Sequence, residues 1–360
     1  MGNRKVALVE LGASHDECVL SQLVALKSVG CHVTVVALKE VVDRNQFWEE
    51  LVDQYHLLDF PKTAIGDFLL MKNLNRFFKV NKIETVVLNT AQGGHVRNLC
   101  LTASRRTQFV GIIHTLRKFE GSFTQKIIHR KIKNYLVLND FFLERILPPK
   151  GCKIESFYPL RFPDFPKENL KKNKEERWVT LIGGVENRRK DLNGSLELMQ
   201  TTKDLTIKFI FLGKSDPAKD EVKLFLDQLH KYNLMDRVVL FNDFVSPQAF
   251  DAYLKKSDLI WPMVHPNTPS AQEYFRNQIS GAINVAFAYK IPLFVHEEYT
   301  KDWKDLHSAS SYSLESFKMD LCQAFEDLPD KKQLLENNPK FDPKFQERKY
   351  VSFVLGLNKD

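Results

Sequence analysis

The sequence predicts an α/β protein built from two open, doubly wound domains, and three observations support this prediction. The chain has 360 residues, of which 43% are hydrophobic and 27% charged, so it can form two globular domains with separate cores. Short runs of Val, Ile and Leu alternate with helical patterns, as expected for parallel sheets that are covered on both faces. A proline-rich and then lysine-rich stretch separates two such series.

The first series extends over residues 1–160, which we predict to be an N-terminal domain. Its strand candidates are Lys5–Val9, His32–Ala37, Thr85–Leu88, Phe109–Ile113 and Tyr135–Leu138. Helical patterns lie between the strands, for example over Cys18–Val29 and Ile65–Phe78.

The second series follows a linker that we place at residues 161–176, where three prolines and then several lysines indicate an exposed connection. The C-terminal domain is predicted over residues 177–335. Its strand candidates are Trp178–Ile182, Ile207–Leu212, Val238–Leu240, Leu259–Trp261 and Pro292–Val295. Residues 340–360 are expected to form a terminal helix that could cross back to the first domain. Two such domains in tandem place a cleft between the carboxyl ends of two sheets, where ligands usually bind.

The charge distribution indicates which partners the protein can have, and the cysteines indicate the compartment in which it is found. The net charge is +7, and nine cations lie between His95 and Lys133 against Glu120 alone. A basic surface of this kind suits a nucleotide, a phosphorylated acceptor or an anionic membrane. A nucleic-acid partner is not expected, because no recognised motif is present. The five cysteines are dispersed and odd in number, which favours reduced thiols in the cytoplasm.

Residues 119–133 are interpreted as a basic amphipathic helix. Phe123, Ile127 and Ile128 alternate there with Lys126 and Arg130. Such a helix can lie on an anionic membrane, which suggests a peripheral location on the inner face of the membrane. The alternative is a helix that packs on the core and has a basic outer face.

A stretch near the end of the second series favours phosphate binding. Ser280 and Gly281 precede a short apolar helix, in which Ile283, Ala286 and Phe287 repeat at helical spacing. Ser280 can cap the helix, and Gly281 lets another group approach the backbone. The free N–H groups and the positive end of the helix dipole suit a phosphate. The alternative is an ordinary helix packed on an ordinary sheet.

Basic residues follow two strands of the same series. Arg188, Arg189 and Lys190 are expected in a strand-to-helix loop, where they could clamp a diphosphate. Lys214 follows Gly213 at the end of the next strand, at the same edge of the sheet. The alternatives are a solvated charge run for the three cations and a surface lysine for Lys214.

In their order along the chain, these motifs resemble the C-terminal half of GT-B glycosyltransferases, notably the retaining, nucleotide-sugar-dependent group. By count, Arg189 falls at the basic diphosphate position of that family, and Lys190 does so if one residue is inserted. Gly213 matches the glycine of the family's Leu-x-Gly element. Ala288–Pro292 matches its closing A-x-G-x-P element, with Lys290 in place of the glycine. The motif resemblance covers residues 181–295.

The departures from the family pattern concern its two glutamates. Asn277 and Val285 stand at the counted positions, and Glu273 can serve as the first glutamate only if the loop is a few residues longer. The resemblance implies two Rossmann-like domains facing across a cleft and the transfer of a hexose, with Glu273 as a catalytic candidate. It also implies retention of configuration, which the missing glutamates leave open.

Loops of the first domain supply the remaining candidates. Gly12, His15 and Asp16 follow the first strand, and His95 follows a polar, glycine-rich loop after a later strand. His114 ends another strand, where a catalytic or sugar-contacting group would stand. For each histidine the alternative is a structural role, and for Asp16 it is helix capping.

We therefore expect a glycosyltransferase that moves a sugar from a nucleotide diphosphate sugar to an acceptor hydroxyl on a glycan or a lipid-linked saccharide, as in polysaccharide biosynthesis. No metal and no cofactor are expected, because cations can neutralise the departing diphosphate and the chain has no D-x-D motif. The absence of G-x-G and of a P-loop motif argues against a dinucleotide oxidoreductase and a P-loop hydrolase. A non-catalytic two-domain protein that binds a nucleotide or a glycan is the alternative.

Overall fold

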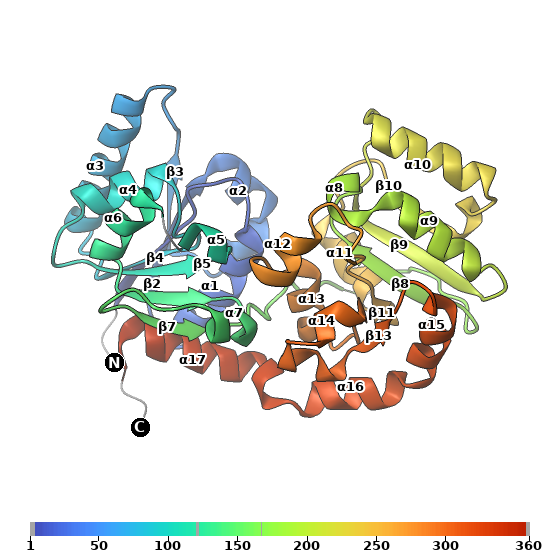
Figure 1. Ribbon diagram of the computed structural model, residues 1–360. Coiled ribbons are helices and arrows are strands. Elements are labelled where there is room, and N and C mark those ends of the chain that lie inside the picture. The colour runs from blue at the N-terminus through green and yellow to red at the C-terminus, as the bar shows by residue number, and fades with distance from the viewer. Residues whose placement is uncertain (1–3, 120–121, 167, 358–360) are drawn as a thin grey trace. The chain divides into compact units, whose positions relative to one another are not determined.

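The computed structural model describes residues 4–119, 122–166 and 168–357. The chain divides into two compact units (Figure 1). Unit 1 comprises Met1–Phe162 and Asp342–Asp360, and unit 2 comprises Pro163–Phe341. Each unit is an α/β structure around a parallel sheet, as the alternating sequence pattern predicts.

Unit 1 contains a seven-stranded sheet in the order β3-β2-β1-β4-β5-β6-β7, and every neighbouring pair is parallel. The strands are β1 (Lys5–Val9), β2 (His32–Leu38), β3 (Gln54–Leu58), β4 (Thr85–Leu88), β5 (Gln108–Ile113), β6 (Asn134–Val137) and β7 (Lys153–Ser156). All five predicted strands of this series are confirmed, within one residue at each end. The strand order reverses between β1 and β4, which is the point where ligands bind in open sheets of this kind.

The two strands that the sequence analysis missed are the two edges of this sheet. β3 reads Gln-Tyr-His-Leu-Leu and β7 reads Lys-Ile-Glu-Ser, so neither contains a continuous apolar run. An edge strand has one side without a neighbouring strand and tolerates polar residues, which removes the pattern that identifies the buried strands.

The helices of unit 1 lie on both faces of the sheet. They are α1 (Val19–Lys27), α2 (Lys39–Arg44), α3 (Ala64–Val80), α4 (Gly94–Thr102), α5 (Leu116–Phe119), α6 (Phe123–Lys131), α7 (Asp140–Arg145) and α17 (Pro343–Leu355), with 3-10 turns at Asp16–Cys18 and Gln46–Trp48. Right-handed connections between parallel strands place α3, α4 and α6 on one face and α1 on the other. Figure 1 shows this separation, with α17 on the α1 side.

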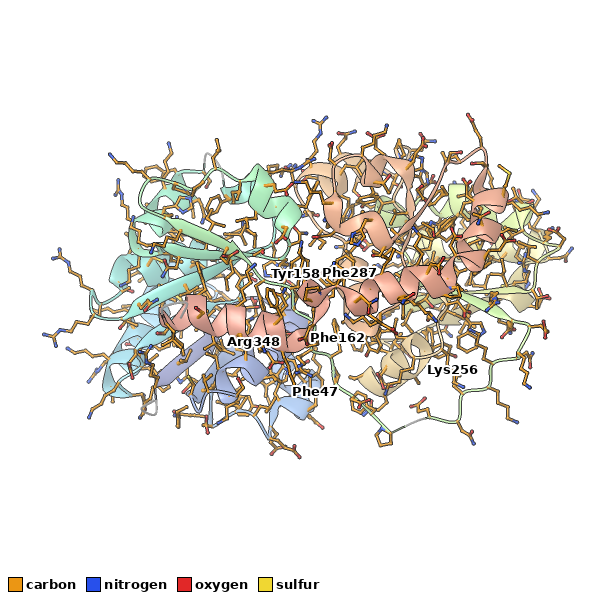
Figure 2. All side chains as sticks on the ribbon, turned by 90° about the horizontal axis from the view of Figure 1, so that it is seen from below. Phe47, Tyr158, Phe162, Lys256, Phe287 and Arg348 are labelled. Carbon is orange, nitrogen blue, oxygen red and sulfur yellow. The ribbon has the colours of Figure 1, made fainter. Side chains whose placement is uncertain are left out.

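The C-terminal helix α17 belongs to unit 1, as expected for a segment that returns to the first domain. The hydroxyl of Tyr350 donates to Gln22 Oε1 of α1 at 3.0 Å. Gln346 Oε1 accepts from the backbone N–H of Tyr158 at 3.1 Å. Figure 2 labels Tyr158 and Arg348, which mark the two segments that meet here. These contacts join residues that are more than 180 positions apart in the chain.

Unit 2 contains a four-stranded parallel sheet in the order β10-β9-β8-β11. Its strands are β8 (Arg177–Ile182), β9 (Ile207–Lys214), β10 (Val238–Phe241) and β11 (Leu259–Ile260), and a parallel pair, β12 (Phe294–His296) and β13 (Ser310–Tyr312), continues from Ile260 through a bridge to Leu293. The helices are α8 (Asn187–Lys190), α9 (Leu192–Thr201), α10 (Asp220–Lys231), α11 (Pro247–Leu254), α12 (Ala271–Arg276), α13 (Gly281–Tyr289), α14 (Glu297–Thr300), α15 (Phe317–Glu326) and α16 (Leu328–Asn337). Turns of 3-10 helix occur at Met235–Arg237, Lys304–Ser308 and Pro339–Phe341.

Two expected segments differ from the structure. Residues 163–176 of the expected linker are part of unit 2, apart from residue 167, which lies outside the described residues. Lys172, for example, donates to Lys256 O and pairs with Asp258. The single helix expected over 119–133 is instead the end of α5 followed by α6, and residues 120–121 lie outside the described residues. Among the described helices, none is long and apolar enough to cross a membrane.

Candidate functional site

In unit 2, two glycines bring the ends of β8 and β9 together. Gly183 follows β8 with φ +95°, a conformation that L side chains rarely adopt. A Cβ on Gly213 would lie 2.3 Å from the carbonyl carbon of Gly183. The glycine of the Leu-x-Gly element therefore allows β9 to pass directly against the loop after β8, at the carboxyl edge of the sheet.

The cations after β8 lie in a short helix, α8, rather than in the expected loop. Lys190 is only 4% exposed, and its ammonium donates to the last carbonyl of β8, Ile182 O, at 2.8 Å. Burial lowers the pKa of Lys190 to about 8, and the neighbouring charge of Arg189 adds to the effect. In this structure Lys190 therefore completes the end of the strand and is not presented to solvent.

Arg189 and Lys214 are exposed cations at this edge, as is Arg188. Arg189 Nε lies 2.9 Å from Glu186 Oε1, and Lys214 Nζ lies 3.1 Å from Asp216 Oδ2. Both side chains are about half exposed. Because exposed ion pairs contribute little energy, an incoming diphosphate can replace either carboxylate at small cost.

The helix α13 begins at Gly281, with Ser280 as its N-cap residue. The backbone of Ser280 is extended, as expected for a cap, but its side chain makes no capping hydrogen bond. A Cβ on Gly281 would meet nothing within 4 Å, so the space beside this first residue of the helix is open. The N–H of Ile283 donates to Ser280 O at 3.0 Å, whereas the N–H groups of Gly281 and Ala282 precede the first hydrogen bond of the helix, which makes this end suitable for an anion.

Glu273 lies on α12, which begins beside α8. The hydroxyl of Ser270 donates to Arg188 O at 2.8 Å and holds the start of α12 against α8. Glu273 is half-buried, and its Oε2 accepts from Asn277 Nδ2 at 3.2 Å. Burial raises the pKa of the nearby Tyr274, whereas the charges of Arg189 and Arg188 lower it. The structure thus brings the Glu273 helix and the Arg189 helix together.

A buried histidine at the same edge was missed by the sequence analysis. His265, in the loop after β11, is 1% exposed, and its Nε2 lies 3.2 Å from Asp191 Oδ2. Asp191 caps α9 by accepting from Gly194 N–H, and it has a left-handed backbone. Burial lowers the pKa of His265, although the charge of Asp191 opposes this effect. The sequence signal for His265 was its position a few residues after a predicted strand.

In unit 1, a buried carboxylate organises the loops after β1 and β4. Glu10 Oε1 accepts from Gly12 N–H at 2.7 Å, which is the role of Gly12. Glu10 Oε2 accepts from Asn89 Nδ2 at 2.7 Å and from Thr90 Oγ1 at 2.8 Å. Burial raises the pKa of Glu10, and these three hydrogen bonds lower it again in part. The position of Glu10 directly after β1 was the signal that the sequence offered for this residue.

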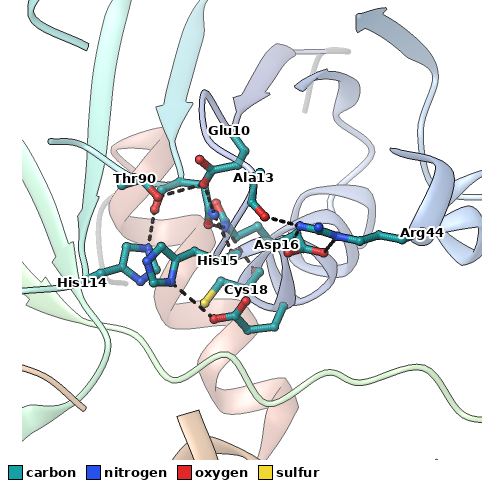
Figure 3. A network of polar contacts seen from close by, with 11 residues as sticks. Glu10, Ala13, His15, Asp16, Cys18, Arg44, Thr90 and His114 are labelled. Carbon is teal, nitrogen blue, oxygen red and sulfur yellow. Dashed lines mark hydrogen bonds and ion pairs between the residues drawn. The ribbon is translucent and has the colours of Figure 1, made fainter. Parts of the chain in front are cut away.

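His15 and His114 are stacked on each other beside this carboxylate (Figure 3). The ring centroids are 3.9 Å apart and the rings are inclined by 24°. His114 Nε2 lies 2.6 Å from Asn89 O and donates to it, because a carbonyl oxygen only accepts. The backbone of His15 is left-handed, with φ 69°, and Asn89 Nδ2 donates to its carbonyl at 2.8 Å. Asn89 therefore connects both histidines with Glu10.

The two stacked histidines differ in charge preference. Burial, and then the charge of His15, lowers the pKa of His114 to about 4. Burial also acts to lower the pKa of His15, but a hydrogen bond to Glu17 and the charges of Glu17 and Glu10 raise it above its usual value. His15 is 40% exposed at its side chain, whereas His114 is buried. The pair thus consists of the solvent-facing imidazole of His15, whose pKa is raised, stacked on the neutral, buried imidazole of His114.

Asp16 and His95 have structural partners. Arg44 donates to both carboxylate oxygens of Asp16, at 2.9 and 2.6 Å, and to Ala13 O (Figure 3). Asp16 therefore holds the loop to α2 and does not cap α1 as the alternative proposed. His95 is the second residue of α4 and pairs with Asp67 of α3 at 2.5 Å. None of the contacts recorded for the described residues connects His95 with Glu10, His15 or His114.

Comparisons with known proteins show which fold this is. No family model matches the sequence, and no curated protein resembles it in sequence. Solved structures that resemble the chain include a glycosyltransferase from Rickettsia africae (12% identity, 99% of this chain and 100% of that chain, TM-score 0.71). A UDP-GlcNAc 2-epimerase from Neisseria meningitidis bound to UDP-GlcNAc has 12% identity, covers 98% of this chain and 100% of its own, and has a TM-score of 0.62. An Anabaena protein in complex with UDP and glucose has 11% identity, with coverage of 98% and 100% and a TM-score of 0.62. Because these likenesses extend over both units, the predicted GT-B fold is confirmed.

Proposed function

We propose that this chain is a glycosyltransferase that moves a sugar from a nucleotide diphosphate sugar to a hydroxyl of a glycan or a lipid-linked saccharide. The observation that carries the proposal is the open first turn of α13 at Gly281, in a fold shared with proteins that hold UDP or a UDP-sugar. A fold alone hosts many activities, so the argument depends on this site.

Unit 2 is assigned the nucleotide sugar donor. The N–H groups of the first turn at Gly281 and the guanidinium of Arg189 bind the diphosphate, and the ammonium of Lys214 adds positive charge. As the bond to the sugar breaks, negative charge grows on the departing diphosphate. Groups that are already oriented towards this charge stabilise the transition state more than the ground state.

Lys190 and Glu273 have supporting roles in this proposal. The buried ammonium of Lys190 fixes the end of β8 from within, so Arg189 rather than Lys190 is assigned to the diphosphate. Glu273 is assigned to a sugar hydroxyl, because carboxylates accept hydrogen bonds from hydroxyl groups. Ser280 contributes through its backbone.

Unit 1 is assigned the acceptor. His15 is the member of the stacked pair that solvent reaches, and it is assigned the contact to a sugar hydroxyl. His114 was expected to be catalytic, but it is buried and donates to Asn89 O, so it positions His15 by stacking. Asp16 and His95 hold the surrounding loops and helices.

The transfer is proposed to need neither a metal ion nor a cofactor, since Arg189, Lys214 and the helix end supply the positive charge. We place the protein in the cytoplasm, with peripheral association at the inner face of the membrane through residues 119–133. A non-catalytic nucleotide- or glycan-binding protein is the alternative, and turnover separates the two.

The first experiment measures donor binding by calorimetry and thermal shift with UDP, GDP, ADP and CMP, with and without Mg²⁺. UDP is expected to bind best, with unchanged affinity in a chelator. Arg189→Ala should weaken binding about tenfold, the usual effect of losing a charged hydrogen bond. Arg188→Ala is the matched control, because Arg188 is also exposed and lies near the same Glu186.

A second pair of variants tests the helix end. Gly281→Leu adds a side chain in open space, so it should keep the melting temperature and abolish UDP binding. Gly94→Leu is the control, because Gly94 also begins a helix and also has nothing within 4 Å of an added Cβ. If no nucleoside diphosphate binds, or if Gly281→Leu binds normally, the proposal is wrong. If UDP-sugars bind and are never transferred to any acceptor, the binding protein is the correct alternative, and a change in the sugar without acceptor indicates an epimerase.

A further inference from the structure

Exposed apolar side chains are concentrated on one side of unit 1. Among the described residues, seven of the thirteen exposed large hydrophobic side chains come from β3, α3, α4 and α6. They are Leu57, Ile65, Phe68, Leu69, Val80, Leu101 and Phe123. Ile65 and Phe123 are 76% and 77% exposed. Single exposed apolar residues are ordinary, but a concentration on neighbouring elements indicates an interaction surface.

The first turns of α3 and α6 carry the most exposed of these side chains. Ile65, Phe68 and Leu69 are spaced by three and four residues, so they form one stripe on the outer side of α3. Phe123 is the first residue of α6. α3 lies between β3 and β4, and α6 follows the short helix α5 between β5 and β6. Each connects two parallel strands and therefore begins toward the carboxyl edge of the sheet, the edge at which His15 and His114 lie.

Polar contacts hold the three helices as one layer, which Figure 1 shows on one face of the sheet. Asp67 of α3 pairs with His95 and accepts from Asn98 Nδ2, both on α4. On the other side of α4, Lys131 of α6 donates to the carbonyls of Ser104 and Thr107 in the segment after it. The exposed side chains are thus carried on a fixed platform.

The charges on this layer are almost all positive. α3, α4 and α6 together contain one acidic residue, Asp67, which is buried and paired with His95. Exposed cations follow the apolar turns along the same helices. They are Lys72, Arg76 and Lys79 on α3, and Lys126 and Arg130 on α6. Apolar side chains next to cations without competing acids match an anionic lipid surface, which offers hydrocarbon and negative headgroups together.

We propose that the outer side of α3, α4 and α6 binds the surface of an anionic lipid bilayer. Ile65, Phe68, Leu69 and Phe123 enter the boundary between headgroups and acyl chains, and the cations of α3 and α6 contact the headgroups. This surface is larger than the basic segment 119–133, and its apolar centre is on α3. The proposal rests on the membrane association proposed above and not on sugar transfer, and it places the outer side of these helices, first turns included, on the membrane.

The test is co-sedimentation of the full chain with vesicles of phosphatidylglycerol and phosphatidylcholine, compared with phosphatidylcholine alone. We expect binding to the anionic vesicles at low salt and a marked loss at high salt. Leu69→Ser should weaken binding about fivefold through lost apolar burial, and Arg76→Gln should do so about fivefold through lost charge. Leu224→Ser is the matched control, because Leu224 is 54% exposed on α10 of unit 2, against 51% for Leu69.

Three outcomes would overturn the proposal. The first is no binding to anionic vesicles at low salt. The second is an equal loss in Leu69→Ser and Leu224→Ser. The third is a dimer in sedimentation velocity that Leu69→Ser dissociates, which would make this surface a contact between two copies of the chain. Unchanged hydrogen exchange of unit 1 peptides in Leu69→Ser shows that unit 1, which carries this residue, is folded, and this control does not use the donor site of unit 2.

Discussion

The buried histidine of unit 1 should make the protein acid-sensitive. His114 has a pKa of about 4 in the folded protein, against an ordinary value of 6.5 for histidine. Between these two values the unfolded chain binds a proton that the folded protein does not bind. The free energy of unfolding is therefore greatest above pH 6.5 and falls as the pH decreases towards 4.

The size of this effect follows from the pKa difference. Each pKa unit corresponds to about 1.4 kcal/mol, so His114 accounts for a loss of about 3 kcal/mol over the whole range. About 2 kcal/mol of this is lost between about pH 7.5 and about pH 5, because folded His114 is still mostly neutral at the lower value. In His114→Gln this part of the loss should disappear. Gln is chosen because its Nε2 can also donate to Asn89 O, as His114 Nε2 does.

The assay is urea unfolding of both proteins at the two pH values, with hydrogen exchange of unit 1 peptides to follow that unit alone. The difference between the two proteins, compared between the two pH values, removes the fixed cost of the substitution and the contributions of groups that do not interact with His114. NMR of labelled histidine gives a direct check, because the His114 signal should not titrate above about pH 5. If His114→Gln loses as much stability as the parent between the two pH values, the assignment of a neutral, buried His114 is wrong.

Two further predictions concern packing. Gly213→Ala should destabilise unit 2 by about 1–3 kcal/mol in urea unfolding, because the new methyl group would overlap the backbone of Gly183. Gly184→Ala should cost far less in the same assay, because its added Cβ would lie 3.5 Å from the nearest atom. An equal cost for both would refute the close approach of β8 and β9. Tyr350→Phe should cost about 1–2 kcal/mol, because Gln22 Oε1 loses its donor in a buried position, and hydrogen exchange of α17 should rise. Unchanged exchange in α17 would contradict this role of the hydroxyl.

The buried strands show what a local sequence pattern can predict. β1 and β4 have the predicted bounds because both lie inside a parallel sheet, where burial on both faces makes every residue after Lys5 and Thr85, the first residues of the two strands, apolar. The edge strands β3 and β7 do not have this constraint and were missed. The helix at Gly281 was also predicted, since its small first residue and apolar repeat are local features.

Local sequence patterns predicted only part of the candidate site. Positions at or after strand ends identified Gly12, His15 and His114 as candidates, because ligands bind at the carboxyl ends of parallel strands. Their chemical states depend on contacts that no local pattern contains. Glu10 and Asn89 are 79 residues apart in the chain and are joined by one hydrogen bond.

The cations after β8 show most clearly which properties follow from the local sequence and which follow from the tertiary structure. The sequence by itself determined the α/β alternation, the positions of the buried strands and the basic character of residues 188–190, because each depends on neighbours within a few positions. Only the tertiary structure decided that Lys190 is buried against Ile182 O while Arg189 is exposed. The same holds for the stacking of His15 on His114 and for the surface of α3, α4 and α6. Burial and charge depend on which distant segments the topology brings together, and that is a property of the folded chain.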